Sequence, residues 1–235
     1  MSTAQIRFSS AHRREQILDI SSGLFAEQGF SGTTTKQIAD QAGVTEALIF
    51  RHFPSKEDLY WEVIERKINS VAPGEQLQQI LEKADDDFET LSRVAFEVLE
   101  RRAQDQTLSR LLLFSALEKH ELSHRFFRNY IADYFAVMER FVQKRIDEGR
   151  LRPVNPLLAA RSFLGMVIYH SWIQELYGGK HVQDFDLHDV SRTIADIWLR
   201  GMRKAAKPER RAKPLSGSTV KKHRVNGNNG KRTST

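Results

Sequence analysis

The sequence contains no cysteine among its 235 residues. This absence excludes disulfides, thiolate-bound zinc and cysteine nucleophiles, and it fits a reducing compartment. No apolar run approaches the roughly 20 residues that a membrane span requires. The first residues, MSTAQIRFSS, also lack the apolar stretch of a secretory signal. We therefore expect an ordinary soluble protein located in the cytoplasm.

Most motifs of enzyme chemistry are missing as well. There is no glycine-rich phosphate loop, no G-x-S-x-G nucleophile elbow and no paired carboxylate constellation. We expect no enzyme activity, no cofactor and no metal site.

One short segment is the exception. His120-Glu121-Leu122-Ser123-His124 matches H-E-x-x-H, in which two histidines one helical turn apart bind zinc and the glutamate activates water. The pattern needs a continuous helix and a third ligand, and here it falls at an expected helix junction with no downstream ligand at a known spacing. An exposed turn is the preferred interpretation, and a zinc-dependent hydrolase remains the alternative.

Positive charge is concentrated at the C-terminal end. The net charge of the chain is +6. Residues 205–235 hold nine Lys or Arg against Glu209 alone, so this segment carries +8 and the remainder carries −2. A uniformly basic surface is therefore excluded, and any contact with nucleic acid upstream depends on a few placed cations. The tail itself could add non-specific DNA affinity, could only solubilise the chain, or could contact a membrane surface, although it lacks an amphipathic basic helix.

Apolar residues recur at helical spacing almost throughout, and no stretch alternates with period two for long enough to indicate a strand. The pattern predicts an all-α fold of about nine helices. We expect these helices at 11–28, 36–42, 46–52, 56–69, 76–103, 105–118, 122–148, 156–177 and 187–204.

The first part of the chain has the pattern of a helix-turn-helix. Gly43 lies between the second and third expected helices, Thr45 and Ser55 are expected N-caps, and a three-helix core would use Ile38, Ala39, Val44, Ile49 and Phe53. This arrangement allows one helix to enter the major groove of DNA. A solvated helical subdomain with no such role is the alternative.

The string from Thr34 to Leu59, TTKQIADQAGVTEALIFRHFPSKEDL, closely resembles the TetR (tetracycline repressor) family of bacterial regulators. The resemblance extends from residue 13 to about residue 65. It implies a flexible arm at 1–11, a DNA-binding domain at 12–57, and an effector-binding and dimerisation domain at 58–204 that starts with a connecting helix at 58–69. The basic tail at 205–235 is polar and nearly devoid of large apolar residues, so we expect it to be disordered.

The resemblance also implies which side chains face DNA, some in the major groove and some against phosphates. The full expected set is Thr34, Thr35, Lys36, Thr45, Glu46, Ala47, Leu48, Phe50, Arg51, His52 and Lys56. Arg51 can form a forked contact to guanine, Glu46 can accept from cytosine, and Phe50 can meet a thymine methyl group. Two features depart from the family pattern: Phe50 stands where tyrosine is usual, and Glu46, being acidic, could instead pair with Arg51.

A single helix-turn-helix covers one half-site, so we expect a homodimer that presents two heads about 34 Å apart on a palindromic operator. Apolar stripes on the last two helices are the candidate interface, with ordinary core as the alternative. These residues are Leu157, Leu164, Gly165, Ile168, Val190, Ile194, Ile197, Trp198 and Gly201.

Aromatic residues are dense between the head and these last helices. In the family this region holds a small-molecule effector, so the resemblance implies a repressor that a small, mostly apolar ligand releases from DNA. The ligand candidates are Phe114, Phe127, Tyr130, His170 and Trp172, any of which could instead simply fill core.

Overall fold

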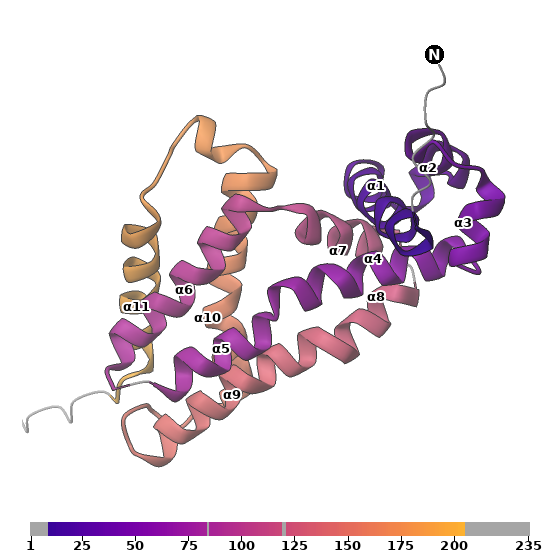
Figure 1. Cartoon of the computed structure of the whole chain (residues 1–235). Helices are drawn as coiled ribbons and strands as arrows, with labels where there is room; N and C mark the ends of the chain where they lie inside the picture. Colours follow the sequence, from indigo (N-terminus) through magenta and orange to yellow (C-terminus); the bar gives the residue numbers. More distant parts are fainter. Residues whose placement is uncertain (1–8, 84, 119–120, 205–235) are drawn as a thin grey trace, which may run out of the picture. The chain divides into compact units, whose positions relative to one another are not determined.

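The computed structural model describes residues 9–83, 85–118 and 121–204 (Figure 1). Every regular element of these residues is helical, which confirms the expected all-α fold. The α-helices are α1 (Ser10–Gly32), α2 (Thr35–Ala42), α3 (Glu46–His52), α4 (Lys56–Val71), α5 (Pro73–Glu82), α6 (Asp87–Gln104), α7 (Thr107–Leu117), α8 (Glu121–Phe126), α9 (Ala132–Asp147), α10 (Pro156–Ser171) and α11 (Leu187–Met202). Two π-helical segments, η1 (Phe127–Ile131) and η2 (Trp172–Leu176), and the 3-10 turn η3 (Gly179–His181) complete the set.

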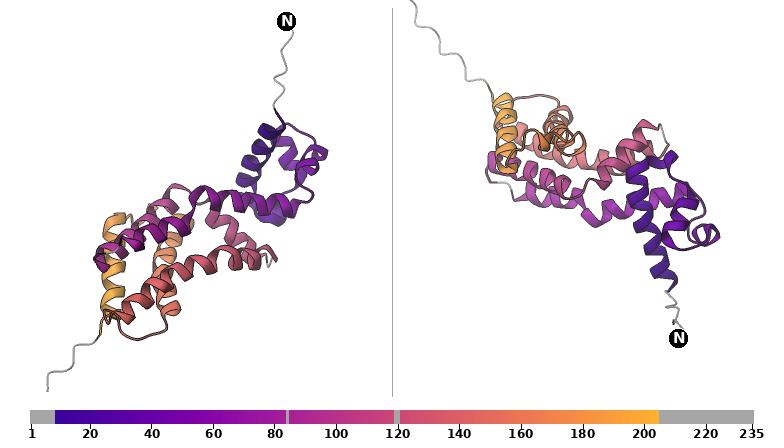
Figure 2. Two further views of the ribbon diagram at one scale, coloured as in Figure 1. Left: turned by 60° about the horizontal axis from the view of Figure 1, so that its bottom comes forward. Right: turned by 90° about the horizontal axis from the view of Figure 1, so that it is seen from above.

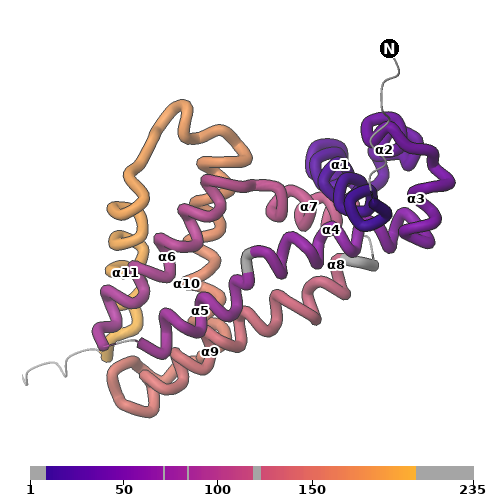
Figure 3. The backbone as a smooth tube through the Cα atoms, viewed as in Figure 1, coloured from indigo at the N-terminus to yellow at the C-terminus, as the bar shows by residue number. Residues whose placement is uncertain are grey.

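The main correction concerns the helix expected at 76–103. It is divided into α5 and α6, and Asp86 caps α6 by accepting a 2.8 Å hydrogen bond from the backbone N–H of Glu89. An aspartate at this position satisfies an orphan N–H group of the first helical turn, so it favours a new helix start over continuation. The helix expected at 122–148 is continuous in the backbone from α8 through η1 to α9 (Figure 3).

The first helix also ends in two stages. Gly29 has φ 77° and ψ 176°, so regular helix stops before it although helical turns resume afterwards. A Cβ at this position would lie 2.8 Å from Cδ1 of Phe114, so both the backbone angle and the space favour glycine.

Two clusters of buried side chains hold the described residues together. One joins α5, α6, α9, α10 and α11, with Leu91, Phe163 and Leu164 at 0% exposure. The other joins α1 to α4 and is closed by Leu111 of α7 and Phe126 of α8. In Figures 1 and 2, α1 to α3 (indigo) lie at one end of the described residues and α10 and α11 (orange to yellow) lie at the other.

Several expected segments lie wholly or partly outside the described residues. They include the basic tail at 205–235 and most of the arm at 1–11. The arm is shorter than expected, because Ser9 already caps α1 and Ser10 and Ala11 are helical. His120 of the H-E-x-x-H segment also lies outside them.

Candidate functional site

The turn between α2 and α3 is built around Gly43. Its backbone is left-handed, with φ 61° and ψ 39°, a conformation that glycine adopts without steric cost. The N–H of Val44 donates to the carbonyl of Ala39 at 3.0 Å, which closes the end of α2. This geometry turns the chain sharply and sets α3 at an angle to α2, as a helix-turn-helix requires.

Each helix of this region starts with a side-chain cap. Thr34 and Gln37 form a reciprocal capping box at α2, while Thr45 accepts from the N–H of Leu48 at 3.2 Å at α3. Ser55 accepts from the N–H of Asp58 at 3.0 Å at α4. The caps expected at Thr45 and Ser55 are thus present. The caps fix where short helices begin, and α3 has only 7 residues.

Helix α3 buries one side chain and exposes its opposite face. Ile49 is 1% exposed and anchors the helix in the head core, whereas Phe50 is 45% exposed. Ala47 and Arg51 are also exposed. The exposed face therefore offers one cation, one aromatic ring and one methyl group, the kinds of side chain that contact base edges.

Glu46 forms a different bond from the one considered from the sequence. Its Oε2 accepts a 2.5 Å hydrogen bond from the hydroxyl of Thr35, across the turn from α2. The carboxylate is thereby tied to α2, and Arg51 is left exposed on α3. This bond braces the two helices against each other at the face that also carries the exposed Lys36.

Two expected phosphate-binding residues, Lys56 and His52, are only partly accessible. The Lys56 ammonium lies 4.2 Å from the centre of the Phe30 ring, and burial lowers the pKa of Lys56. His52 is half-buried, and its Nε2 has no hydrogen-bond partner in the described part of the chain. Because this nitrogen is itself buried, the structure does not present it to a phosphate at the surface.

The five ligand candidates fall into two places. Phe114 packs beside Gly29, and Tyr130 packs at 5.6 Å from Phe126 at the edge of the head core, with Phe127 exposed beside it. His170 and Trp172 lie instead at the junction of α10 and η2. The sequence suggested a single group only because aromatic residues are dense in this part of the chain. Within the described residues, no ring contact or hydrogen bond joins Phe114, Phe127 or Tyr130 to His170 or Trp172.

Sequence reasoning missed a polar group close to His170 and Trp172. The Nε of Arg102 on α6 donates to the Ser171 hydroxyl at 2.7 Å. Burial raises the pKa of Tyr134, on the adjacent α9, to about 12. The sequence feature that could have indicated this group is the position of Arg102 on the apolar side of the amphipathic helix α6.

The candidate interface residues divide between core and surface. Buried residues in the subunit's own core are Leu164, Val190, Ile194 and Trp198, with exposures of 0%, 9%, 9% and 5%. This corrects the expectation for these four residues, because side chains packed in the subunit's own core have little or no surface left for a partner. Leu157 and Ile168 are half-buried, while Gly165, Ile197 and Gly201 are exposed.

The described residues contain neither a membrane-spanning helix nor a cluster of metal ligands. Within 9–83, 85–118 and 121–204, no helix combines the length and apolarity needed to cross a bilayer. Over the same residues, no group of three or more His, Asp or Glu side chains is arranged to bind a metal ion.

Comparisons with known proteins identify both parts of the chain. Residues 17–63 match the model of the bacterial regulatory proteins of the tetR family, and residues 89–201 match the C-terminal domain of AefR-like transcriptional repressors. The chain is 30% identical over 159 residues to nucleoid occlusion factor SlmA of Vibrio campbellii, covering 66% of this chain and 80% of that protein. It is 29% identical over 197 residues to the transcriptional regulator AcrR of Shigella flexneri, covering 79% and 87%.

A solved structure shares the fold. NalD, the secondary repressor of the MexAB-OprM multidrug efflux pump in Pseudomonas aeruginosa, superposes with a TM-score of 0.64 at 22% identity, covering 83% of this chain and 98% of that one. The matched family is not enzymatic, so the zinc-dependent hydrolase is set aside. From its matched N-terminal and C-terminal regions, the chain belongs to the TetR family of DNA-binding transcriptional regulators.

Proposed function

We propose that the chain is a homodimeric repressor that binds a palindromic operator through α3 and leaves it when a small molecule binds among the helices of the body. The observation that carries the proposal is the division of α3, with Ile49 buried and Ala47, Phe50 and Arg51 exposed. Phe50 leaves 45% of its surface exposed, although it is a large aromatic residue on a 7-residue helix. Contact with a DNA groove would bury it.

The proposed DNA contacts follow from this geometry. Arg51 and Lys36 supply exposed charge for bases and phosphates, and Ala47 and Phe50 supply apolar contact. Thr34, Thr45 and Thr35 have hydroxyls engaged in the fold, so we propose that they contribute mainly by fixing the helix starts. Lys56, held over the Phe30 ring, and the helix start at α4 would receive a phosphate.

For the dimer we propose the exposed faces of α10 and α11. Leu158 is 62% exposed and Ile197 is 58% exposed, and both are large apolar side chains. Gly165 and Gly201 lie on the same faces, and a Cβ at either would have no atom within 4 Å. Small residues beside exposed apolar ones allow helices of a second copy to approach closely, as in a four-helix interface.

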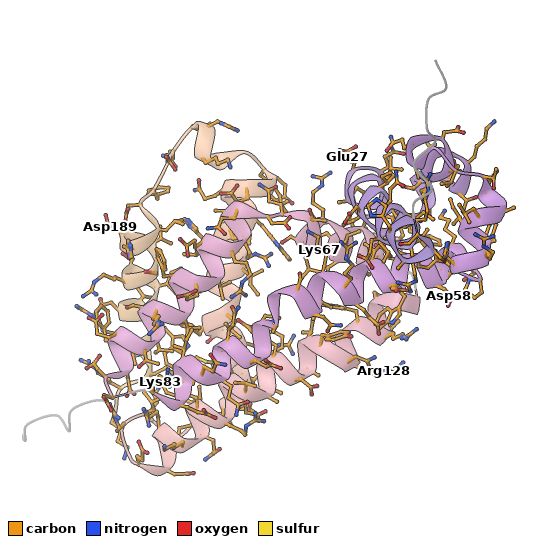
Figure 4. The ribbon with its side chains drawn as sticks, in the orientation of Figure 1. Glu27, Asp58, Lys67, Lys83, Arg128 and Asp189 are labelled. Carbon is orange, nitrogen blue, oxygen red and sulfur yellow. The ribbon has the colours of Figure 1, made fainter. Side chains whose placement is uncertain are left out.

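The proposed link from body to head runs through α4. Its Lys67, labelled in Figure 4, contacts Asp105 between α6 and α7 at 2.7 Å. A ligand that moves α6 or α7 would therefore displace α4 and change the separation of the two heads.

The test is selection of bound fragments from a genomic library with the full chain, followed by fluorescence anisotropy on the enriched duplex. We expect an inverted repeat, a symmetric pair of subunits per site, and affinity that falls with added salt. A chain that fails to enrich any duplex at low ionic strength would refute the proposal.

A further inference from the structure

The side chain of Arg102 is partly buried, and within the described residues it forms no ion pair. Its Nε is bound to the neutral hydroxyl of Ser171, and burial lowers the pKa of Arg102 to about 10. The nearest charge along the chain is Arg101, which has the same sign and bonds to Gln76 at 2.5 Å. Among the described residues no carboxylate forms an ion pair with Arg102.

The neighbouring acid is already neutralised. Glu175 lies one helical turn beyond Ser171, and its side chain is 10% exposed. Its Oε2 accepts from the Lys180 ammonium at 2.6 Å and from the Gln106 amide at 2.9 Å. Arg102 and Gln106 therefore make parallel bonds to Ser171 and Glu175, and only the Gln106 pair includes a negative charge.

Further polar atoms on residues near Ser171 in the sequence are buried without partners. They are Nε2 of His170, Nε1 of Trp172 and Oε1 of Gln174, within the described residues. Trp172 begins the π-helical segment, a distortion that often occurs where a helix is shaped for a ligand. Buried polar atoms are normally satisfied, so three unpartnered ones within residues 170–174 set this helix end apart from the rest of the described residues.

We propose that the effector of this protein carries a negatively charged group, a carboxylate or a phosphate, that binds the guanidinium of Arg102 beside Ser171. Tyr134 on α9, which interacts electrostatically with Arg102, lies beside this group. This inference rests on the proposed function only in naming the ligand as the effector. A guanidinium suits both anions, because its parallel N–H groups match two oxygens.

The first experiment is isothermal titration calorimetry on the full chain with four probes that share one chain length: decanoate, decyl phosphate, 1-decanol and decylamine. We expect binding of one or both anions and much weaker binding of the alcohol and the amine. Comparing decanoate with decyl phosphate tells which anion the site prefers. Equal binding of the alcohol or the amine, or no binding of either anion, would overturn the proposal.

The matched variants are Arg102→Met and Arg101→Met, which remove the same charge at adjacent positions. Arg102→Met should weaken anion binding about tenfold or more, as for a lost bond between charged partners, and Arg101→Met should leave it nearly unchanged. Arg102→Lys should recover part of the affinity. Equal losses in Arg102→Met and Arg101→Met would show that the site depends on overall charge, against the proposal.

A third measurement needs no organic ligand. Arg102→Met removes an uncompensated charge, so the unliganded variant should melt no lower than wild type. Inorganic phosphate at matched ionic strength should raise the melting temperature of wild type more than that of Arg102→Met. A lower melting temperature with no phosphate difference would make Arg102 purely structural.

Operator binding by the same samples separates the two proposals. If the chain binds DNA but no anion, the proposed DNA-binding function is supported and the anion site at Arg102 is refuted. If it binds an anion but no DNA, the anion site is supported and the proposed DNA-binding function is refuted.

Discussion

The hydroxyl of Tyr60 on α4 donates a 2.7 Å hydrogen bond to the backbone carbonyl of Leu111 on α7. Both residues are 0% exposed, and both belong to the core that holds the DNA-binding helices. Burial raises the pKa of Tyr60, so this phenol stays protonated and keeps donating at physiological pH. The bond therefore joins the helix that leaves the head to a helix of the body.

Replacing Tyr60 with Phe removes this bond and little volume. We expect the free energy of unfolding to fall by about 1 kcal/mol, the usual net contribution of such a bond, with a larger fall if the carbonyl loses all other partners. Urea denaturation followed by circular dichroism measures the change. Tyr177→Phe is the control, because Tyr177 is 79% exposed, and it should leave stability unchanged.

Arg51→Ala should weaken operator binding by about 1–3 kcal/mol if its guanidinium contacts a base. Lys36→Ala should weaken binding of all duplexes more evenly and reduce the salt dependence by about one counterion. Fluorescence anisotropy at several salt concentrations measures both. Arg93→Ala, which removes a 65% exposed arginine of α6, is the control. Unchanged affinity in both test variants would remove the exposed face of α2 and α3 from the interface.

Ile197→Glu places a charge on the proposed dimer face. Because Ile197 is 58% exposed, the subunit should fold normally while the dimer dissociates, and operator affinity should fall with it. Sedimentation velocity and circular dichroism separate association from folding. Leu117→Glu is the matched control, since Leu117 is 76% exposed on α7. A dimer that survives Ile197→Glu unchanged argues for another interface.

Lys67 and Asp105 predict a dependence of stability on pH. Burial alone would raise the pKa of Asp105, but hydrogen bonds from Lys67 and Thr107 outweigh it and lower the pKa to about 2, from an ordinary value of 3.8. A carboxyl with a depressed folded pKa stabilises the fold above its unfolded pKa and loses that contribution as pH falls through the folded pKa. Because the Asp105 side chain is 48% exposed, solvent screening limits the effect to about 0.5–1 kcal/mol.

The measurement compares wild type with Asp105→Asn by urea denaturation at a series of pH values. Wild type should be the more stable protein above about pH 4, and the difference should shrink as pH falls toward 2. Asp133→Asn, which removes an exposed carboxylate on α9, should show no such convergence. A constant difference between wild type and Asp105→Asn would contradict the assignment.

The sequence was most informative where structure is decided locally. Caps at Thr45 and Ser55 and the left-handed Gly43 depend on residues within one turn, so their types alone predict the helix starts. The break near Asp86 was also a local signal, since Asp86 and Glu89 have the spacing of an N-terminal cap. It was missed because the apolar spacing on both sides fits one long helix.

The rest depended on tertiary contacts. Periodicity marked Leu164 and Ile197 as members of the apolar stripes on the last two helices. Only the packing of α10 against α6 and α9, and of α11 against α6, shows that Leu164 is core and Ile197 is surface. The unpaired charge at Arg102 likewise cannot be read from spacing, because its surroundings come from α9 and α10, more than 30 residues away. The site residues that face solvent were easier to identify than those that face each other.

The core formed by α1 to α4 also contains Leu111 of α7 and Phe126 of α8, both of which follow the helix-turn-helix by dozens of residues. A fragment that ends after α4 would lack Leu111 and Phe126, so part of its hydrophobic core would be exposed to solvent. We expect such a fragment to aggregate instead of binding DNA as a monomer. For the same reason, a chimera that joins α1 to α4 of this chain to another regulator must also include α7 and α8. The DNA-binding helices α1 to α4 therefore have to be transferred together with α7 and α8.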